Sequence, residues 1–257
     1  QALGHRHCVV LLGGLRHRSM AQMRTWLEER RALGIDTLVA TFSGHDALHD
    51  HWNNQPGNYR FQLDCLQLAA ELGMKLQQRM LMMRSNLATL PAVIDDLEAI
   101  SGALPVDRWA IPMFYSGRAR HLEAERLSEA DFASIPARLR HFLREDHPRW
   151  RAEHRWIDHV EQEAGDEPQH VSLAVDLSPA GLDWAEARTC DEIVDTLTAR
   201  YLASAACLPA RTALCAAYAD RGNERVYFNL PQMECLWMER YLVDHPEARD
   251  AASLLFS

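Results

Sequence analysis

The chain has 257 residues, 47% of them hydrophobic and 25% charged, a composition that supports a folded core and excludes intrinsic disorder. Its 27 Lys and Arg against 36 Asp and Glu give a net charge of −9, and the cations are scattered. A nucleic-acid groove needs a basic stripe, so we expect no nucleic-acid partner. No apolar run approaches the roughly 20 residues of a membrane span, and no signal peptide precedes the first apolar run. We therefore expect a cytoplasmic protein without a membrane partner.

Apolar runs with strand character alternate with helical patterns in the first 120 residues. The runs at 8–12, 37–42, 75–83 and 108–114 indicate four buried strands. Strands joined by single helices must be parallel, with right-handed crossovers. Such a series builds either a barrel or an open doubly wound sheet, and four units are half of an eight-fold barrel. The predicted fold class is α/β: a partial (β/α) TIM-like barrel followed by a smaller α+β C-terminal region.

The pattern changes after residue 120. Residues 121–168 are rich in charge and indicate a helical connector, and 169–257 indicate a C-terminal α+β domain with strands at 170–177 and 225–229. The predicted domains are therefore 1–120, 121–168 and 169–257. Several helix starts are marked by polar residues that can cap the first turn; they are Ser19 with Gln22, Asn86, Ser128 with Asp131, and Thr189 with Glu192.

The six cysteines lack the spacing of a cluster or disulfide framework. No pair has the C-x-x-C spacing, so we expect reduced, mostly buried thiols. An iron–sulfur cluster needs closely spaced thiolates. Cys207 and Cys215 flank Pro209, and buried thiols are favoured there over ligands of an auxiliary cluster. The cysteines are Cys8, Cys65, Cys190, Cys207, Cys215 and Cys235.

Recognisable motifs follow the second and third predicted strands. The strand at 37–42 ends in Ser43-Gly44, and a His49-Asp50 pair then precedes a loop that ends in Gly57. The third strand leads into Arg84-Ser85-Asn86, and the fourth is followed by Gly117-Arg118-Ala119. In order and spacing these motifs, over roughly residues 8–120, resemble the middle and end of the barrel of a radical S-adenosylmethionine (SAM) enzyme.

The resemblance implies a function for the parent protein. Such an enzyme cleaves SAM reductively, using a 4Fe–4S cluster, and abstracts hydrogen from a substrate; a peptide is one candidate, because family members with C-terminal extensions often modify peptides. The three-cysteine cluster loop and the Gly-Gly-Glu motif would precede residue 1. Gly13-Gly14 is a less suitable candidate for the second motif, because Leu15 replaces its acid. We therefore expect a fragment that lacks the cluster ligands and is inactive alone.

The resemblance also implies roles for particular residues. Ser43 and Gly44 would contact the cofactor, Ser43 through its ribose, and Arg84 would bind the SAM carboxylate with a bidentate fork. Ser43 is equally well explained as a turn residue after a strand. Asp50 and Arg118 would close loops at the barrel rim, and Asn86 is a helix cap rather than a ligand. No catalytic residue is assigned.

Two other functions remain open. His45, His49 and His51, with Asp46 and Asp50, could ligate a metal and support a metal-dependent hydrolase, although a solvated loop is the plainer interpretation. The His-Asp pair resembles that of HD phosphohydrolases, which place it on helices. A third reading is a non-catalytic binding module on a degenerate barrel. No nucleophile elbow, P-loop or dinucleotide fingerprint is present.

Overall fold

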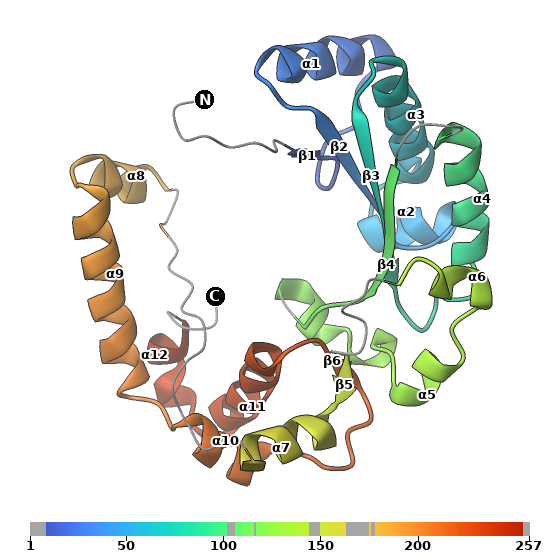
Figure 1. Cartoon of the computed structure of the whole chain (residues 1–257). Coiled ribbons are helices and arrows are strands. Elements are labelled where there is room, and N and C mark those ends of the chain that lie inside the picture. The colour runs from blue at the N-terminus through green and yellow to red at the C-terminus, as the bar shows by residue number, and fades with distance from the viewer. Residues whose placement is uncertain are drawn as a thin grey trace. The chain divides into compact units, whose positions relative to one another are not determined.

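The computed structural model describes residues 9–101, 106–115, 117–143, 150–162, 175 and 178–253. The chain divides into two compact units (Figure 1). The first comprises Gln1–Met113 with His121–Arg149, and the second comprises Phe114–Arg120 with Trp150–Ser257.

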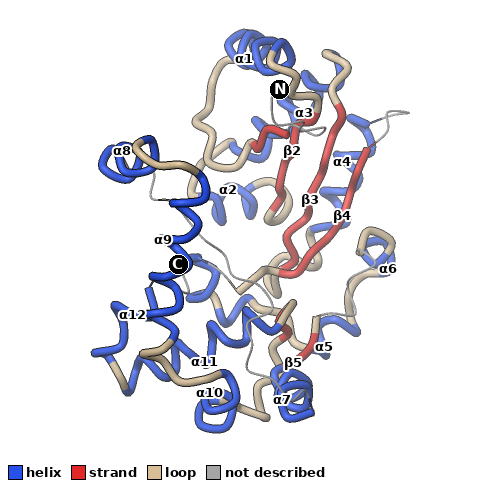
Figure 2. Tube along the Cα trace, turned by 60° about the vertical axis from the view of Figure 1, so that its left-hand side comes forward, coloured by secondary structure: helices blue, strands red, loops and turns tan. Residues whose placement is uncertain are grey.

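A four-stranded parallel sheet forms the first unit, which confirms the α/β class. Its strands are β1 (Val9–Leu11), β2 (Thr37–Phe42), β3 (Lys75–Met82) and β4 (Val106–Pro112), in the order β1-β2-β3-β4. Figure 2 shows β2, β3 and β4 side by side. Each strand therefore pairs with the strand that comes next in the sequence, because each helical connection carries the chain to the adjacent position in the sheet.

Three long helices of the first unit pack on one face of this sheet. These are α1 (Met20–Ala32), α3 (Asn58–Glu71) and α4 (Leu90–Ser101); α1 contacts α3, and α3 contacts α4 and the strands (Figure 1). Each helix buries an apolar stripe, as amphipathic helices on a sheet do. The opposing residues of the sheet are equally buried; they include Leu38, Ala40, Phe42, Leu76, Met80 and Met82.

Four segments of the first unit differ from the predicted elements. Residues Ala47–Asn53 form the short helix α2, where a loop was expected. Asn86 does not cap α4, which begins four residues later, at Leu90. The single helix expected after Ser128 is two, α5 (Glu129–Ala133) and α6 (Ala137–Arg140), because Pro136 has no N–H to continue the first. The 3-10 helix η2 (Glu123–Glu125) precedes them; the other 3-10 helix, η1 (Gly117–His121), belongs mostly to the second unit.

The chain returns to the sheet after α6. The Ala110 N–H donates to the Phe142 carbonyl at 2.7 Å, and Ala110 forms an isolated parallel bridge with Leu143. A fifth parallel segment therefore lies beside β4, on the edge away from β3. This segment extends the strand order β1-β2-β3-β4 by one further position in the same direction.

The second unit is mainly helical. A two-stranded antiparallel pair, β5 (Arg151–Ala152) with β6 (Val226–Tyr227), lies among α7 (Glu153–Gln162), α10 (Arg211–Tyr218) and α11 (Leu230–Asp244). Its core contains Trp156, Tyr227 and Trp237. The unit also contains α8 (Pro179–Glu186), α9 (Cys190–Ala205), η4 (Pro246–Ala248) and α12 (Arg249–Ser253). The strand expected at 170–177 falls, except for residue 175, outside the described residues.

Two further observations concern the chain as a whole. None of the helices that the structure describes combines the length and apolar character needed to cross a bilayer. The cysteines are less buried than expected: Cys65 and Cys215 are buried, but Cys190 and Cys207 are exposed. Cys8 lies outside the described residues.

Candidate functional site

The residues expected to bind a cofactor lie at one edge of the sheet. Ser43 and Gly44 directly follow β2, and Arg84 follows β3 by two positions. Because β2 and β3 are parallel neighbours, their carboxyl ends meet at the same edge. In α/β folds this edge is where ligands bind.

The turn after β2 is held in a conformation that requires glycine. Gly44 has φ +138°, and a Cβ there would lie 2.9 Å from Leu48 Cγ. The Ser43 N–H donates to Nδ1 of His49 at 3.0 Å. This hydrogen bond holds the Ser43 backbone at the end of β2. Ser43 follows Thr41 by two residues, the spacing that places two strand residues on the same face of a sheet.

Arg84 is held at the edge by weak contacts of its side chain. Its backbone N–H donates to the Glu125 carbonyl at 2.9 Å, while its Nε lies 3.3 Å from Asp131 Oδ2. The Arg84 side chain is 47% exposed, so this ion pair stabilises little and a ligand carboxylate can compete for Arg84. The neighbouring Asn86 instead closes the turn, accepting from the Met83 N–H and donating to the Leu81 carbonyl.

The three histidines expected as an alternative metal site point to different partners. His45 Nε2 lies 3.3 Å from Asp96 Oδ2 on α4. His49 is fully buried, and exposed His51 stacks edge-on against Trp52. Among the residues that the structure describes, no three His, Cys, Asp or Glu side chains are placed to hold a metal ion. The structure therefore does not bring these imidazoles together.

His49 has a structural environment that favours the neutral ring. Burial lowers its pKa to about 4, although the charge of Asp50 opposes this. Because Nδ1 accepts from the Ser43 N–H, the neutral ring carries its hydrogen on Nε2. The amide nitrogens of Asn53, Asn58 and Gln62 surround Nε2 at 3.3, 3.1 and 3.4 Å. Protonation would place two donors face to face at Nδ1. Neutral His49 therefore positions Ser43.

Asp50 connects α2 to the start of α3. Its two carboxylate oxygens accept from the Gly57 N–H at 2.5 Å and the Tyr59 N–H at 2.8 Å. Asp50→Ala is expected to lower the free energy of unfolding of the first unit by about 1–2 kcal/mol, since it removes the cap of α3. Urea unfolding measures this. Asp64→Ala, which removes an i,i+4 pair of half-buried Asp64 with exposed Arg60 on the same helix, should change stability by less than about 0.5 kcal/mol; equal effects would contradict the capping role.

A polar row on the sheet was not expected from the sequence. Gln78 and Arg108 bond to Ser101 of α4, so they face the helices. The odd-numbered residues of β3 and β4 face the opposite side of the sheet, and we call that side the inner face. It carries Gln77, Arg79 and Leu81 of β3 and Asp107, Trp109 and Ile111 of β4. The sequence signal that could have indicated this row is the alternation in β3, where the odd-numbered positions 75, 77 and 79 are polar.

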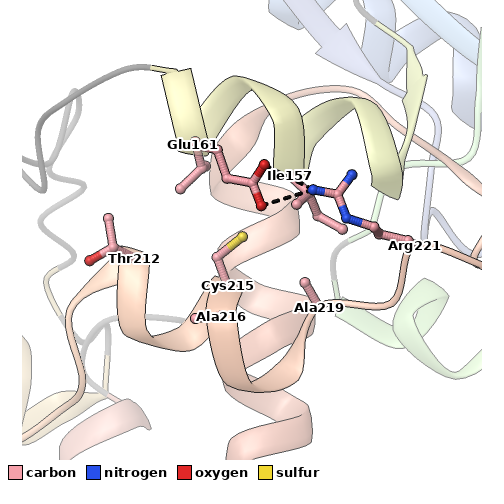
Figure 3. A pocket seen from close by; sticks show the side chains of 8 residues that line it. Ile157, Glu161, Thr212, Cys215, Ala216, Ala219 and Arg221 are labelled. Carbon is pink, nitrogen blue, oxygen red and sulfur yellow. Dashed lines mark hydrogen bonds and ion pairs between the residues drawn. The ribbon is translucent and has the colours of Figure 1, made fainter.

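The second unit contains a separate cavity of about 450 Å³ between α7 and α10 (Figure 3). Cys215 projects into it, beside the ion pair of Arg221 with Glu161. Burial raises the pKa of this thiol to about 11, and the Glu161 carboxylate adds to the effect. Cys215 therefore stays protonated near neutral pH and is a poor nucleophile.

Comparison with protein-family models gives no match for this chain, and comparison with curated proteins gives none either. Function is therefore proposed from the geometry of the site and from the motifs of the sequence.

Proposed function

We propose that the first unit is part of a radical SAM enzyme barrel and that its sheet edge binds SAM. The observation that carries the proposal is the strand order β1-β2-β3-β4 with α1, α3 and α4 together on one face. A doubly wound sheet places helices on both faces and reverses its strand order. A barrel wall keeps all helices outside and advances one strand at a time, leaving the other face to line an interior.

The proposed contacts with SAM use groups at the carboxyl ends of neighbouring strands. Ser43 hydrogen-bonds the ribose, and the close turn at Gly44 lets the adenosine approach the backbone. Arg84 exchanges its partner Asp131 for the SAM carboxylate, which matches the fork of a guanidinium. These residues bind and orient the cofactor.

The cluster that such an enzyme uses does not fit the cysteines that the structure describes. A 4Fe–4S cluster needs thiolates close together. Cys65 is buried in α3, with its pKa raised to about 12 by burial, and the other described cysteines lie in the second unit. No step is therefore assigned to the cluster here. The proposed role of this chain is to bind SAM and substrate.

Titration of the isotope-labelled full chain with SAM, followed by amide NMR, tests this proposal. We expect the largest shifts at residues 43, 44 and 84–86. Arg84→Gln should weaken binding about tenfold, since the bidentate, charge-assisted pair proposed with the SAM carboxylate contributes roughly 1.4 kcal/mol, more than the single contact with Asp131.

Arg24→Gln is the matched control for this titration. Arg24 is also half-exposed and pairs with one carboxylate, Glu71 at 2.7 Å, but it lies on α1. It should leave SAM binding unchanged. Shifts confined to the second unit, or none at the edge of the sheet, would refute the proposed cofactor site.

A further inference from the structure

We propose that the arginines around Trp26 bind a small ligand with two linked phosphate groups. The surface comprises Arg16 and Arg18, which lie between β1 and α1, together with Trp26 and Arg30 of α1; we call it the arginine surface. No motif of the sequence singles it out, and its ligand differs from SAM, which has no phosphate group.

The arginine surface carries positive charge in an acidic protein. Residues 16–31 contain five arginines and two glutamates, a net charge of +3, whereas the whole chain has a net charge of −9. The first turn of α1 contains no acidic residue that would compete with a ligand. An anion is therefore attracted to this segment, while the rest of the chain carries net negative charge.

Two guanidinium groups of the surface share one aromatic ring. Arg30 Cζ lies 4.6 Å from the centre of the Trp26 ring, and Arg18 Cζ lies 5.7 Å from it. Stacking on an indole holds a planar guanidinium in place and leaves its N–H donors free to bind an anion. Because two like charges around one ring repel each other, an anion that contacts both is favoured.

The protein's own carboxylates leave much of this charge unpaired. Arg16 and Arg18 are exposed, and neither bonds to an acidic side chain within the part of the chain that the structure describes. Arg30 has one contact, with Glu29 Oε2 at 3.1 Å. Glu29 is 60% exposed, so this pair is weak and a ligand can replace it.

The loop that carries the first two arginines is anchored on both sides of them. His17, between them, packs its ring on Phe61 of α3, with the ring centres 4.6 Å apart. The loop begins with a tight turn, in which the Leu15 N–H donates to the Leu12 carbonyl at 3.1 Å and Gly14 has φ +75°. These contacts limit the conformational entropy that binding would cost.

The spacing of the cations favours a diphosphate over a single carboxylate. One carboxylate is satisfied by the fork of one arginine, whereas a phosphate group offers three acceptor oxygens. A single exposed ion pair contributes little, so a site of this kind must engage several cations at once. Two linked phosphates do so, one at Arg18 and the other at Arg30. Inorganic pyrophosphate and a nucleoside diphosphate share this chemistry.

Titrations of the full chain with phosphate, pyrophosphate and ADP test the inference. They are made at about 0.15 M salt, where scattered surface charges are largely screened. The readout is the indole N–H signal of Trp26, assigned with Trp26→Phe. We expect pyrophosphate to bind at least about tenfold more tightly than phosphate, and Arg18→Gln and Arg30→Gln each to weaken pyrophosphate about tenfold.

Arg31→Gln is the matched control. It removes the same charge from the residue next to Arg30, and within the described residues Arg31 contacts neither Trp26 nor an acidic side chain. It should leave pyrophosphate binding unchanged. Equal weakening by Arg31→Gln, or no binding of pyrophosphate at this salt concentration, would mean that the attraction is diffuse and would overturn the inference.

The remaining comparisons identify the source of the diphosphate. Equal affinities for ADP and pyrophosphate place recognition in the diphosphate alone, and tighter binding of ADP that both variants weaken identifies a nucleotide. A single-stranded oligothymidylate that binds more tightly than either would reveal a surface for an extended polyanion and overturn the inference. We expect SAM to leave the Trp26 signal unchanged, so a failure of pyrophosphate to bind is distinct from a failure of the proposed cofactor site.

Discussion

Glu153→Ala is expected to lower the free energy of unfolding of the second unit by about 3–5 kcal/mol, the usual cost of breaking a buried ion pair. The Glu153 side chain is fully buried. One oxygen accepts from Trp237 Nε1 at 2.7 Å, Arg240 Nη1 at 2.6 Å and the Asp220 N–H at 2.9 Å. The other accepts from Asn223 at 2.6 Å and from Arg240 Nη2 at 3.0 Å.

The size of this effect comes from the groups left behind. Alanine would leave the Trp237 indole N–H without its acceptor in a low-dielectric interior, where an unmade hydrogen bond is costly. It would also remove the carboxylate from Arg240, which is 29% exposed and keeps the Tyr218 carbonyl as an acceptor. Denaturant unfolding followed by the Trp237 indole signal measures the loss. Glu161→Ala on the same helix removes an exposed pair with Arg221 and should cost less than about 1 kcal/mol. Similar losses for both variants would mean that Glu153 does not organise this core.

Acidification is expected to destabilise the first unit through His49 alone by about 3 kcal/mol between pH 6.5 and pH 4. The folded pKa is near 4, because burial disfavours the charged ring, whereas the unfolded chain titrates near 6.5. Within this window the unfolded state binds more protons. Stability therefore falls as the pH is lowered, and the His49 contribution is fully present only above about pH 6.5.

Two variants isolate this contribution from the titration of carboxylates. His49→Asn keeps an acceptor for the Ser43 N–H but cannot be protonated in this range, so its unfolding free energy should fall less steeply with acid than that of the wild type. His51→Asn, at an exposed ring two residues away, should follow the wild type. Parallel curves for all three proteins would contradict a buried, neutral His49.

Strand and helix patterns predicted much of the first unit from its sequence. The apolar run at residues 37–42 coincides with β2, because the polar Asp36 and Ser43 bound it. The capping box of Ser19 with Gln22 begins α1 as predicted. Such local signals suffice where hydrophobic period and cap chemistry agree. The partial barrel stays a prediction.

The elements that were missed depend on contacts far apart in the sequence. Helix α2 has no side-chain cap at Asp46, and it is held by the burial of His49 against α3. Its polar sequence gave no helical period. Apolar residues at helical spacing, Phe132, Ile135, Leu139 and Phe142, predicted one helix after Ser128, but Pro136 divides it into α5 and α6.

Only part of the candidate site could be predicted from the sequence, because the rest also depends on contacts between residues far apart in the chain. Ser43 and Arg84 follow strands directly, so their place at one edge can be derived from chain order. The row of Gln77, Arg79 and Trp109 requires the register between β3 and β4, and register is set by packing of the whole sheet. The partners of His45 and His49 likewise come from side chains on α3 and α4.

A comparison of SAM with decarboxylated SAM, in the wild type and in Arg84→Gln, tests the central claim most directly. The two ligands differ only in the carboxylate that Arg84 is proposed to bind. We predict that the wild type binds SAM about tenfold more tightly than the decarboxylated form. Arg84→Gln should weaken SAM to that same level and leave the decarboxylated ligand unchanged. Equal weakening of both ligands by Arg84→Gln, or weakening of neither, would contradict a SAM site at this edge of the sheet.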